Sequence, residues 1–202
     1  MARGPDPFER IDPSDDAVFY SVDRLVTHIE AGAIEALRAT YAHELPKGGA
    51  VLDLMSSWRS HLPPTLGPVT GLGMNAAELA ANDQLETWVV HDLNAAPHLP
   101  FDDASFDACV CAVSVQYLTR PLEVWADVRR ALRPGAPCVI SFSNRCFPTK
   151  AVRIWRSLGD EDHLRLVSTY LTEAGFSDVG GGRVQSTDDP LWVVTGRVPS
   201  GA

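Results

Sequence analysis

The stretch that decides the fold is Val51-Leu52-Asp53-Leu54, a short apolar run with one carboxylate, which leads into Met55-Ser56-Ser57-Trp58-Arg59-Ser60-His61. A continuous apolar run of this length is typical of a strand that is buried on both faces of a parallel sheet. In a doubly wound α/β protein, ligands bind outside the carboxyl ends of such strands. Loops at that position commonly contain glycines, because glycine lets the backbone approach a ligand closely. This loop contains none.

The composition is that of an ordinary globular protein. The chain has 202 residues, of which 45% are hydrophobic and 21% are charged, and this size is sufficient for one domain with a substantial core. Its formal net charge is −9, and an acidic surface repels the phosphate backbone of nucleic acids, so a nucleic-acid substrate is disfavoured. There is neither an apolar signal core nor a run of roughly 18 apolar residues that could span a bilayer. A cytoplasmic protein without a membrane partner is therefore predicted.

The four cysteines do not form a recognisable redox or zinc motif. Cys109, Cys111, Cys138 and Cys146 include no CxxC pair and no zinc spacing with histidine, so reduced thiols and no metal site are predicted. Cys109 and Cys111 are expected in the core. Cys146 has two interpretations: it is a structural side chain, or it is a reactive thiol whose pKa the adjacent Arg145 lowers.

The first 45 residues divide into two parts. Residues 1–16 contain three prolines and four aspartates, which predicts a flexible arm. Residues 17–45 are predicted to form a helical cap, because apolar residues recur every four positions from Leu25 to Tyr41, as expected of one or two helices. Residues 46–202 are then predicted to form an α/β core, so that the chain is one domain overall.

From residue 46 onward, predicted strands and helices alternate. The strands are expected at 50–54, 69–72, 87–90, 106–113 and 137–142, with a terminal antiparallel pair at 179–184 and 191–198, and the helices at 75–82, 121–132, 151–158 and 161–174. This order predicts a Rossmann-like α/β fold. Its seven-stranded sheet is mostly parallel with an antiparallel C-terminal strand, and helices cover both faces. Pro63 and Pro64 leave room for at most one or two helical turns between the first two strands.

Several segments together resemble the class I S-adenosylmethionine-dependent methyltransferases, and most closely those called methyltransferase type 11. They are Val51-Leu-Asp-Leu54, Asp92, Leu99-Pro-Phe-Asp-Asp-Ala-Ser-Phe-Asp107, Tyr117-Leu118 and Ala131-Leu-Arg-Pro-Gly135. The likeness covers about residues 49–145. It implies S-adenosylmethionine as cofactor, S-adenosylhomocysteine as product and a small molecule as the methyl acceptor.

The cofactor positions depart from that family in two places. Met55, Ser57 and Arg59 stand where the family has glycines, and Gly73 stands where it has an acid that holds the ribose hydroxyls. Serine hydroxyls and an arginine can bind a carboxylate instead, and an indole can lie beside a sulfonium. The resemblance further implies that Asp92 accepts a hydrogen bond from the adenine amino group. The predicted cofactor-binding residues are Asp53, which is expected to orient the loop, Ser56, Ser57, Trp58, Arg59, Gly73, Asn75 as a substitute ribose contact, Asp92, Leu93 and Ser114.

The acceptor is expected at the same edge of the sheet. Asn144 and Arg145 follow the fifth strand, Gln116 follows the fourth, and Tyr20 and His28 lie near the start of the cap. These residues are the predicted substrate contacts. If the acceptor carries a proton, His61 or Tyr117 is predicted to remove it.

Two functions are compatible with these features. One is a methyltransferase that acts on a small molecule with an atypical cofactor loop. The other is a catalytically inactive, methyltransferase-like protein that binds S-adenosylmethionine, S-adenosylhomocysteine or another ligand as a regulator or assembly partner. A dehydrogenase is disfavoured, because it also needs the glycines and the ribose acid.

Overall fold

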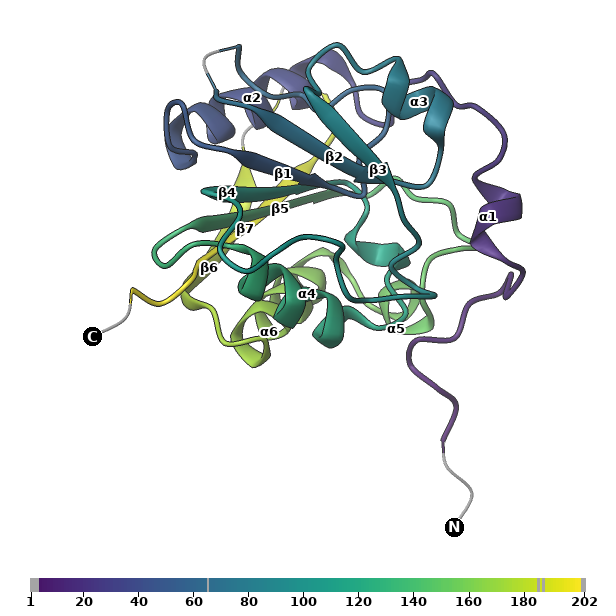
Figure 1. The fold of residues 1–202 in the computed structure, drawn as a ribbon. Coiled ribbons are helices and arrows are strands. Elements are labelled where there is room, and N and C mark those ends of the chain that lie inside the picture. Colours follow the sequence, from purple (N-terminus) through teal and green to yellow (C-terminus); the bar gives the residue numbers. More distant parts are fainter. Residues whose placement is uncertain (1–3, 65, 185, 187, 201–202) are drawn as a thin grey trace.

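The computed structural model describes residues 4–64, 66–184, 186 and 188–200 (Figure 1). Its centre is a seven-stranded sheet with the order β3-β2-β1-β4-β5-β7-β6. The strands are β1 (Val51–Leu54), β2 (Val69–Gly73), β3 (Thr87–Val90), β4 (Ala108–Ala112), β5 (Pro137–Ser143), β6 (Ser177–Val184) and β7 (Leu191–Arg197). The first five pair in parallel, and β7 runs antiparallel to both β5 and β6. The predicted fold class is confirmed.

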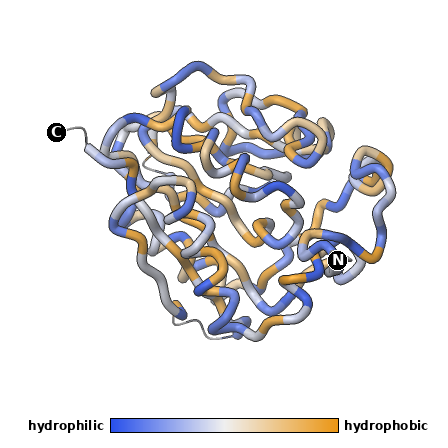
Figure 2. Tube along the Cα trace, turned by 90° about the horizontal axis from the view of Figure 1, so that it is seen from below, coloured by the Kyte–Doolittle hydropathy of each residue, from blue (hydrophilic) through white to orange (hydrophobic). Residues whose placement is uncertain are grey.

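Helices cover both faces of this sheet (Figure 1). One face carries α2 (Ala31–Glu44) and α3 (Ala76–Ala80), and the other carries α4 (Pro121–Ala131), α5 (Arg153–Ser157) and α6 (Asp160–Glu173). The short helix α1 (Asp16–Phe19) lies beside the sheet. A 3-10 turn, η1 (Val115–Tyr117), follows β4. Figure 2 shows hydrophobic and hydrophilic stretches alternating along the chain, as expected when each element buries one face. In the part of the chain that the structure describes, no helix is long and apolar enough to cross a membrane.

The central strands bury side chains on both faces, which explains their continuous apolar sequences. In β4, Ala108 and Val110 pack with the side chains of α2, whereas Cys109 and Cys111 belong to the larger core formed with α4 and α6. Both thiols are fully buried, and burial raises their pKa values well above the ordinary range. The two cysteines are therefore core residues.

The crossover from β1 to β2 contains no helix in its described residues, 55–64 and 66–68. Pro63 and Pro64 lie within it, and proline disrupts a helix interior because it lacks the amide hydrogen and its ring collides with the preceding turn. The helix that packs over β1 on this face is instead α2, which precedes β1 in the sequence.

Residues 21–30 are not helical, although the apolar spacing predicted one or two helices between Ser21 and Glu44. The only helix in that interval begins at Ala31. Leu25 and Val26 are 54% and 57% exposed, so the spacing does not reflect a buried helix face there. We call residues 16–28 the strap, because this segment crosses the carboxyl edge of the sheet and contributes to the cavity described below.

A buried lysine holds the start of the strap against the core. Lys150 is 0% exposed, and its Nζ lies 3.1 Å from Oδ1 of Asp16 and 3.2 Å from Oδ2 of Asp12. The same ammonium donates to the carbonyl oxygen of Ser14 at 2.8 Å. The segment predicted as a flexible arm thus contributes three residues to a buried contact, while its flexibility and the predicted domain boundaries stay predictions.

Asp16 is the centre of this contact. Burial by itself would raise the pKa of its carboxyl group, but hydrogen bonds from Arg10, Asn94 and Lys150 outweigh burial and lower the pKa. Asp16 is therefore an ionised group in a 4% exposed position. Such a charge is tolerated only when it is paired and hydrogen-bonded.

Candidate functional site

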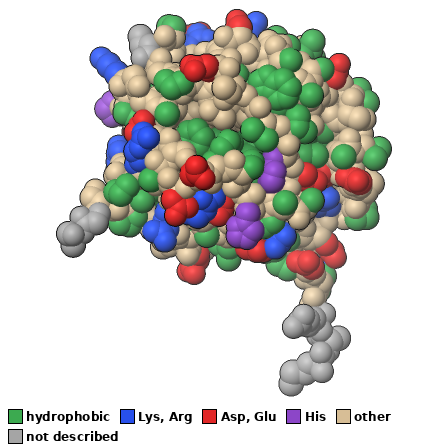
Figure 3. Space-filling view, in the orientation of Figure 1, with side chains coloured by type: hydrophobic (Ala, Val, Ile, Leu, Met, Phe, Trp, Pro, Cys, Tyr) green, Lys and Arg blue, Asp and Glu red, His purple; other side chains and the backbone are tan. Residues whose placement is uncertain are grey.

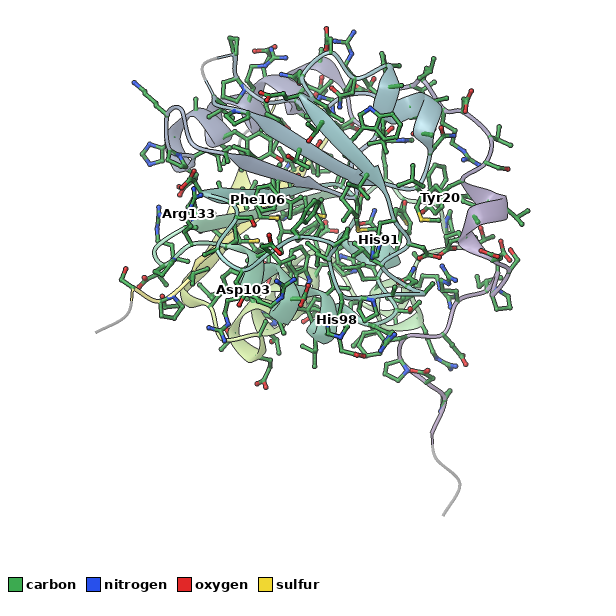
Figure 4. The ribbon with its side chains drawn as sticks, viewed as in Figure 1. Tyr20, His91, His98, Asp103, Phe106 and Arg133 are labelled. Atoms are coloured by element: carbon green, nitrogen blue, oxygen red, sulfur yellow. The ribbon has the colours of Figure 1, made fainter. Side chains whose placement is uncertain are left out.

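A cavity of about 350 Å³ opens at the carboxyl ends of β1, β2, β3 and β4. Its volume is in the range of small-molecule sites. The lining comes from the loops after these strands, from the strap and from the loop after β5. In Figure 4, Tyr20 of the strap and His91 at the end of β3 both lie at this edge of the sheet. The predicted site residues that line the cavity are Tyr20, His28, Asp53, Ser56, Ser57, Trp58, Arg59, His61, Gly73, Asn75, Asp92, Leu93, Ser114, Tyr117 and Arg145.

The serines of the loop after β1 fold back onto Asp53. Oδ2 of Asp53 accepts hydrogen bonds from the hydroxyls of Ser56 at 2.5 Å and Ser60 at 2.6 Å. The amide of Asn82 donates to the Ser60 hydroxyl at 2.9 Å and to the carbonyl oxygen of Ser57 at 2.8 Å. This network supports the interpretation that Asp53 orients the loop. It also occupies the hydroxyl of Ser56, which was predicted to bind the cofactor.

Asp53 has an unusual pKa for a carboxyl group. The side chain is 2% exposed, and burial raises its pKa from 3.8 to about 6, although the hydrogen bonds from Ser56 and Ser60 oppose this shift. The folded protein therefore retains a proton at pH values where the unfolded chain has released it. Between about pH 4 and pH 6 the stability of the fold falls as the pH rises, by about 3 kcal/mol in total.

The variant Asp53→Asn is expected to be more stable than the wild type at pH 8 and equally stable at pH 4. Asparagine removes the buried charge and keeps an oxygen that accepts from both serines. Urea unfolding at the two pH values measures the difference. Asp107 is the matched control, because a hydrogen bond from Arg133 lowers its pKa, so Asp107→Asn is expected to lose stability at pH 8. Identical pH profiles for wild type and Asp53→Asn would contradict a buried, charged Asp53.

The backbone of this loop keeps a conformation that glycine adopts easily. Met55, at the first glycine position of the family, has a φ angle of +57°. Val113, after β4, has a φ of +46°, which is rare for a β-branched residue. Both residues line the cavity, and backbone strain of this kind is concentrated at functional sites.

Gly73 lies where the family has its ribose-binding acid, and the structure explains why no side chain is present. A Cβ added to Gly73 would lie 2.2 Å from the carbonyl oxygen of Ser56. The amide of Ser56 also donates to the carbonyl oxygen of Leu72 at 2.8 Å, which fixes the loop against the end of β2. With the loop in this position, a side chain at residue 73 would collide with the loop backbone.

Asn75 does not offer a free group to a ribose. Its Oδ1 accepts from the amides of Ala77 and Glu78 and thereby caps α3. Its Nδ2 donates to the carbonyl oxygen of Tyr20 at 3.0 Å and to the carboxylate of Asp23 at 2.8 Å. The side chain thus fastens the strap to α3, and a direct ligand role for Asn75 is not supported.

Glu78 is a cavity residue that the sequence analysis missed. Its Oε2 accepts from the Ser57 hydroxyl at 2.6 Å, and its Oε1 accepts from the backbone amide of Arg24 at 2.7 Å. A carboxylate thus lies between the loop after β1 and the strap. Glu78 lies in the first turn of α3, a helix that Asn75 caps and that follows β2 directly. This position in the sequence could have predicted that Glu78 lies near the carboxyl edge of the sheet.

Asp92 and Leu93 occupy the end of β3 as predicted. Oδ1 of Asp92 accepts from the backbone amides of Asn94 at 2.8 Å and Ala95 at 3.2 Å, so the carboxylate is held in a defined orientation. Leu93 is 4% exposed and contributes an apolar wall to the cavity. An apolar wall beside a fixed hydrogen-bond acceptor suits a flat ring that carries an amino group.

Trp58 and Arg59 belong to the loop after β1 and line the cavity. The indole Nε1 of Trp58 donates to the carbonyl oxygen of Val26 at 2.9 Å, which ties the loop to the strap. The Arg59 guanidinium lies 4.7 Å from the Trp58 ring centroid, and its Nη1 is 3.6 Å from the carboxylate of Asp83. Arg59 is therefore paired at the surface.

Tyr117, His28 and His61 also line the cavity. The hydroxyl of Tyr117 accepts from the amide of Phe147 at 2.8 Å, and burial raises the pKa of Tyr117 to about 12. Burial lowers the pKa of His28 and, together with Arg38 and Arg59, lowers that of His61 to about 4. At neutral pH both imidazoles are uncharged and the phenol keeps its proton. Of the two catalytic candidates, only His61 therefore has an unprotonated ring nitrogen at this pH, and its lowered pKa makes it a weak base.

Phe147 was also missed, although it belongs to the same loop as Asn144 and Arg145. Its ring lies 5.5 Å from the ring of Phe19, 5.5 Å from that of His28 and 5.9 Å from that of Tyr117, measured between centroids. These contacts join the strap, the loop after β5 and the 3-10 turn into one aromatic wall.

Two predicted substrate contacts do not line the cavity. Gln116 is buried and its Nε2 donates to the carbonyl oxygen of Val113 at 2.7 Å, and Asn144 is exposed outside the lining. Arg145 does line the cavity, but its guanidinium is paired with Glu30 and, at 2.7 Å, with Asp189.

The interpretation of Cys146 as a thiol with a lowered pKa is wrong, because partial burial raises its pKa.

Comparisons with known sequences find one domain match and one short alignment. Residues 57–140 match the family model described as a methyltransferase domain. The biotin biosynthesis bifunctional protein BioHC of Teredinibacter turnerae is 38% identical over 58 residues, which cover 29% of this chain and 10% of that protein. The aligned part therefore spans about a tenth of the length of this curated relative.

Comparisons with solved structures place the fold among many similar chains. A putative methyltransferase of Haloferax volcanii, in complex with the Trm112 methyltransferase activator, has a TM-score of 0.66 at 16% identity and covers 85% of this chain and 91% of that one. A methyltransferase of Aquifex aeolicus that depends on S-adenosylmethionine has a TM-score of 0.62 at 17% identity, and the match covers 83% of this chain and 91% of that one. Phosphoethanolamine N-methyltransferase 2 of Haemonchus contortus, in complex with S-adenosylmethionine, has a TM-score of 0.59 at 14% identity, and the match covers 82% of this chain and 52% of that one. At these identities the likeness concerns the fold.

Proposed function

We propose, on the premise that this chain belongs to the class I S-adenosylmethionine-dependent methyltransferases, that it transfers a methyl group from S-adenosylmethionine to a small-molecule acceptor. One observation carries the proposal. The cavity combines the loop after β1, Asp92 and Leu93 after β3, and Ser114 after β4 at the carboxyl edge of the sheet, where ligands of open α/β sheets bind.

The chemistry of the lining fits this cofactor. S-adenosylmethionine combines a purine with two positively charged groups, a sulfonium and an ammonium. Leu93 and Leu118 provide apolar surface for the purine, and Asp53, Glu78 and Asp92 provide carboxylates. Among the described residues, the hydrogen bonds to Asp92 use only its Oδ1, which leaves the other oxygen for the adenine amino group.

When bound, S-adenosylmethionine supplies an activated methyl group, and the residues of this chain position the acceptor. Methyl transfer depends mainly on in-line placement of the nucleophile, about 3 to 3.5 Å from the methyl carbon. Residues of the strap and Phe147 form part of the cavity wall, where they limit the access of water to the reacting groups. His61 lines the cavity and is neutral at pH 7, because burial and the nearby arginines lower its pKa. It is the candidate base for an acceptor that releases a proton, and its low pKa makes it a weak one.

The variant Asp92→Ala is expected to bind S-adenosylmethionine at least tenfold more weakly than the wild type. A hydrogen bond to a charged group contributes about 1.5 to 3 kcal/mol, and 1.4 kcal/mol corresponds to a factor of ten. Isothermal titration calorimetry with S-adenosylmethionine and with S-adenosylhomocysteine measures the affinity. Asp103→Ala is the control, because Asp103 is 78% exposed and lies outside the cavity lining (Figure 4).

The outcomes separate the two candidate functions. A wild-type protein that binds neither compound at millimolar concentration contradicts the proposal. Equal affinities for wild type and Asp92→Ala place the adenine elsewhere. Binding of S-adenosylmethionine without turnover to S-adenosylhomocysteine on a broad panel of small acceptors favours the inactive, ligand-binding alternative.

A further inference from the structure

A second cavity, of about 440 Å³, lies beside the crossover from β1 to β2. The crossover supplies one side of this groove, α2 supplies Arg38, and the turn before β3 supplies Asp83 and Gln84. In the described lining, the charged or titratable side chains are Arg38, Arg59, His61 and Asp83. We call this cavity the arginine groove.

The arginine groove contrasts with the rest of the protein. The chain has a formal net charge of −9, and acidic and basic side chains are intermixed over the face seen in Figure 3. The groove, in contrast, combines two arginines with a single carboxylate. An anion is the ligand that this balance of charge favours.

The two arginines form only weak, solvent-exposed ion pairs within the protein. Arg38 pairs with Glu35 at 2.7 Å, and Arg59 pairs with Asp83 at 3.6 Å. Both carboxylates are strongly exposed, at 68% and 74% of their side-chain surface. Exposed ion pairs of this kind contribute little stability, typically about 0.2 to 1 kcal/mol, so either guanidinium can exchange its partner for a ligand.

The groove and the first cavity lie next to each other, because two residues line both. Arg59 and His61 line both. His61 has a φ angle of +56° and is 9% exposed, so its ring is held between the two cavities by a constrained backbone. An anionic group bound in the groove would therefore lie beside two residues that also line the first cavity, Arg59 and His61.

We propose that the arginine groove binds an anionic group of the methyl acceptor, a phosphate or a carboxylate, with Arg38 and Arg59 as its donors. A guanidinium donates two parallel hydrogen bonds to either group, which gives orientation as well as charge recognition. Leu62 and Leu66, which also line the groove, provide apolar contact for the body of such a molecule. This inference rests on the proposed function, because it assigns the acceptor's charge class.

The test uses inorganic phosphate and acetate as probes of the full chain. Wild-type protein is expected to bind at least one of them with a millimolar dissociation constant, and Arg38→Gln and Arg59→Gln are each expected to weaken that binding at least fivefold. Titration of the His61 ring signals by NMR is expected to show an upward pKa shift when the probe is bound, because the anion offsets the two guanidinium charges. Tighter binding of phosphate than of acetate assigns a phosphorylated acceptor, and the reverse order assigns a carboxylate.

Arg165→Gln is the matched control. Arg165 pairs with Asp162 on α6 in the same i,i+3 arrangement as Arg38 with Glu35, and it lies outside both cavity linings. The control is expected to bind the probe as the wild type does. Wild-type protein that binds neither probe, or Arg38→Gln that binds as well as the wild type, contradicts the anion site.

A separate measurement distinguishes this inference from the proposed function. Arg38 lines only the arginine groove, so Arg38→Gln is expected to bind S-adenosylmethionine with unchanged affinity. Wild-type protein that binds phosphate but not S-adenosylmethionine contradicts the proposed function and leaves the anion site supported. Wild-type protein that binds S-adenosylmethionine but neither anion contradicts the anion site and leaves the proposed function supported.

Discussion

Replacement of Lys150 by alanine is expected to lower the free energy of unfolding by about 3 to 5 kcal/mol, the usual effect of removing one partner from a buried ion pair. Lys150 is fully buried, and its ammonium contacts Asp12, Ser14 and Asp16. Without it, Asp16 keeps the pairing with Arg10 but loses one of its two cations. Urea unfolding measures the loss.

The same variant is expected to loosen the strap. Because the strap lines the cavity, Lys150→Ala should also bind S-adenosylmethionine more weakly and be cleaved faster by a protease within residues 4–28. Arg153→Ala is the control, because Arg153 joins Glu9 of the same segment through a half-exposed pair, for which a change of about 1 kcal/mol or less is expected. Equal losses in the two variants would show that the buried lysine has no special role.

Gly73→Asp is expected to weaken cofactor binding at least tenfold, although it introduces the acid that the family has at this position. A Cβ at Gly73 would lie 2.2 Å from the carbonyl oxygen of Ser56, and that backbone atom cannot move without displacing the loop. Overpacking typically destabilises a protein by about 1 to 3 kcal/mol, so a lower unfolding temperature is expected as well. Calorimetry and thermal unfolding measure the two effects.

Gly180→Asp is the control for this substitution. Gly180 lies in the edge strand β6, and a Cβ added there would meet no atom within 4 Å. It introduces the same charge without a steric conflict, so cofactor affinity should be unchanged. If Gly73→Asp bound the cofactor more tightly than the wild type, the loop would be free to move aside, and the link between the loop and the missing acid would be wrong.

Local sequence determined most of the regular elements. Apolar runs such as Val51–Leu54 give buried parallel strands, since residues that face helices on both sides leave no polar alternation. Asn75 caps α3 with its own side chain, and Pro63 and Pro64 disfavour a helix in the crossover, whose described residues contain none. Each of these effects acts within a few residues, so each can be predicted from a short window.

The same local reasoning failed for residues 21–30. The spacing of Leu25 and its neighbours fits a helical period, yet Leu25 and Val26 are more than half exposed in an extended strap. Hydrogen bonds to Trp58, Asn75 and Glu78 hold this segment. All three partners are more than 30 residues away in the sequence, so no local pattern could reveal them.

The sequence by itself thus determined the fold class, the order of the elements along the chain and most of the residues that line the cavity at the carboxyl edge of the sheet. Only the tertiary structure decided what the loop after β1 does. Ser56 and Ser60 donate hydrogen bonds to Asp53, and Ser57 donates to Glu78, so the serine hydroxyls of this loop stabilise the loop itself. The physical reason is that a buried carboxylate requires hydrogen-bond donors, and which donors reach it depends on packing between distant segments.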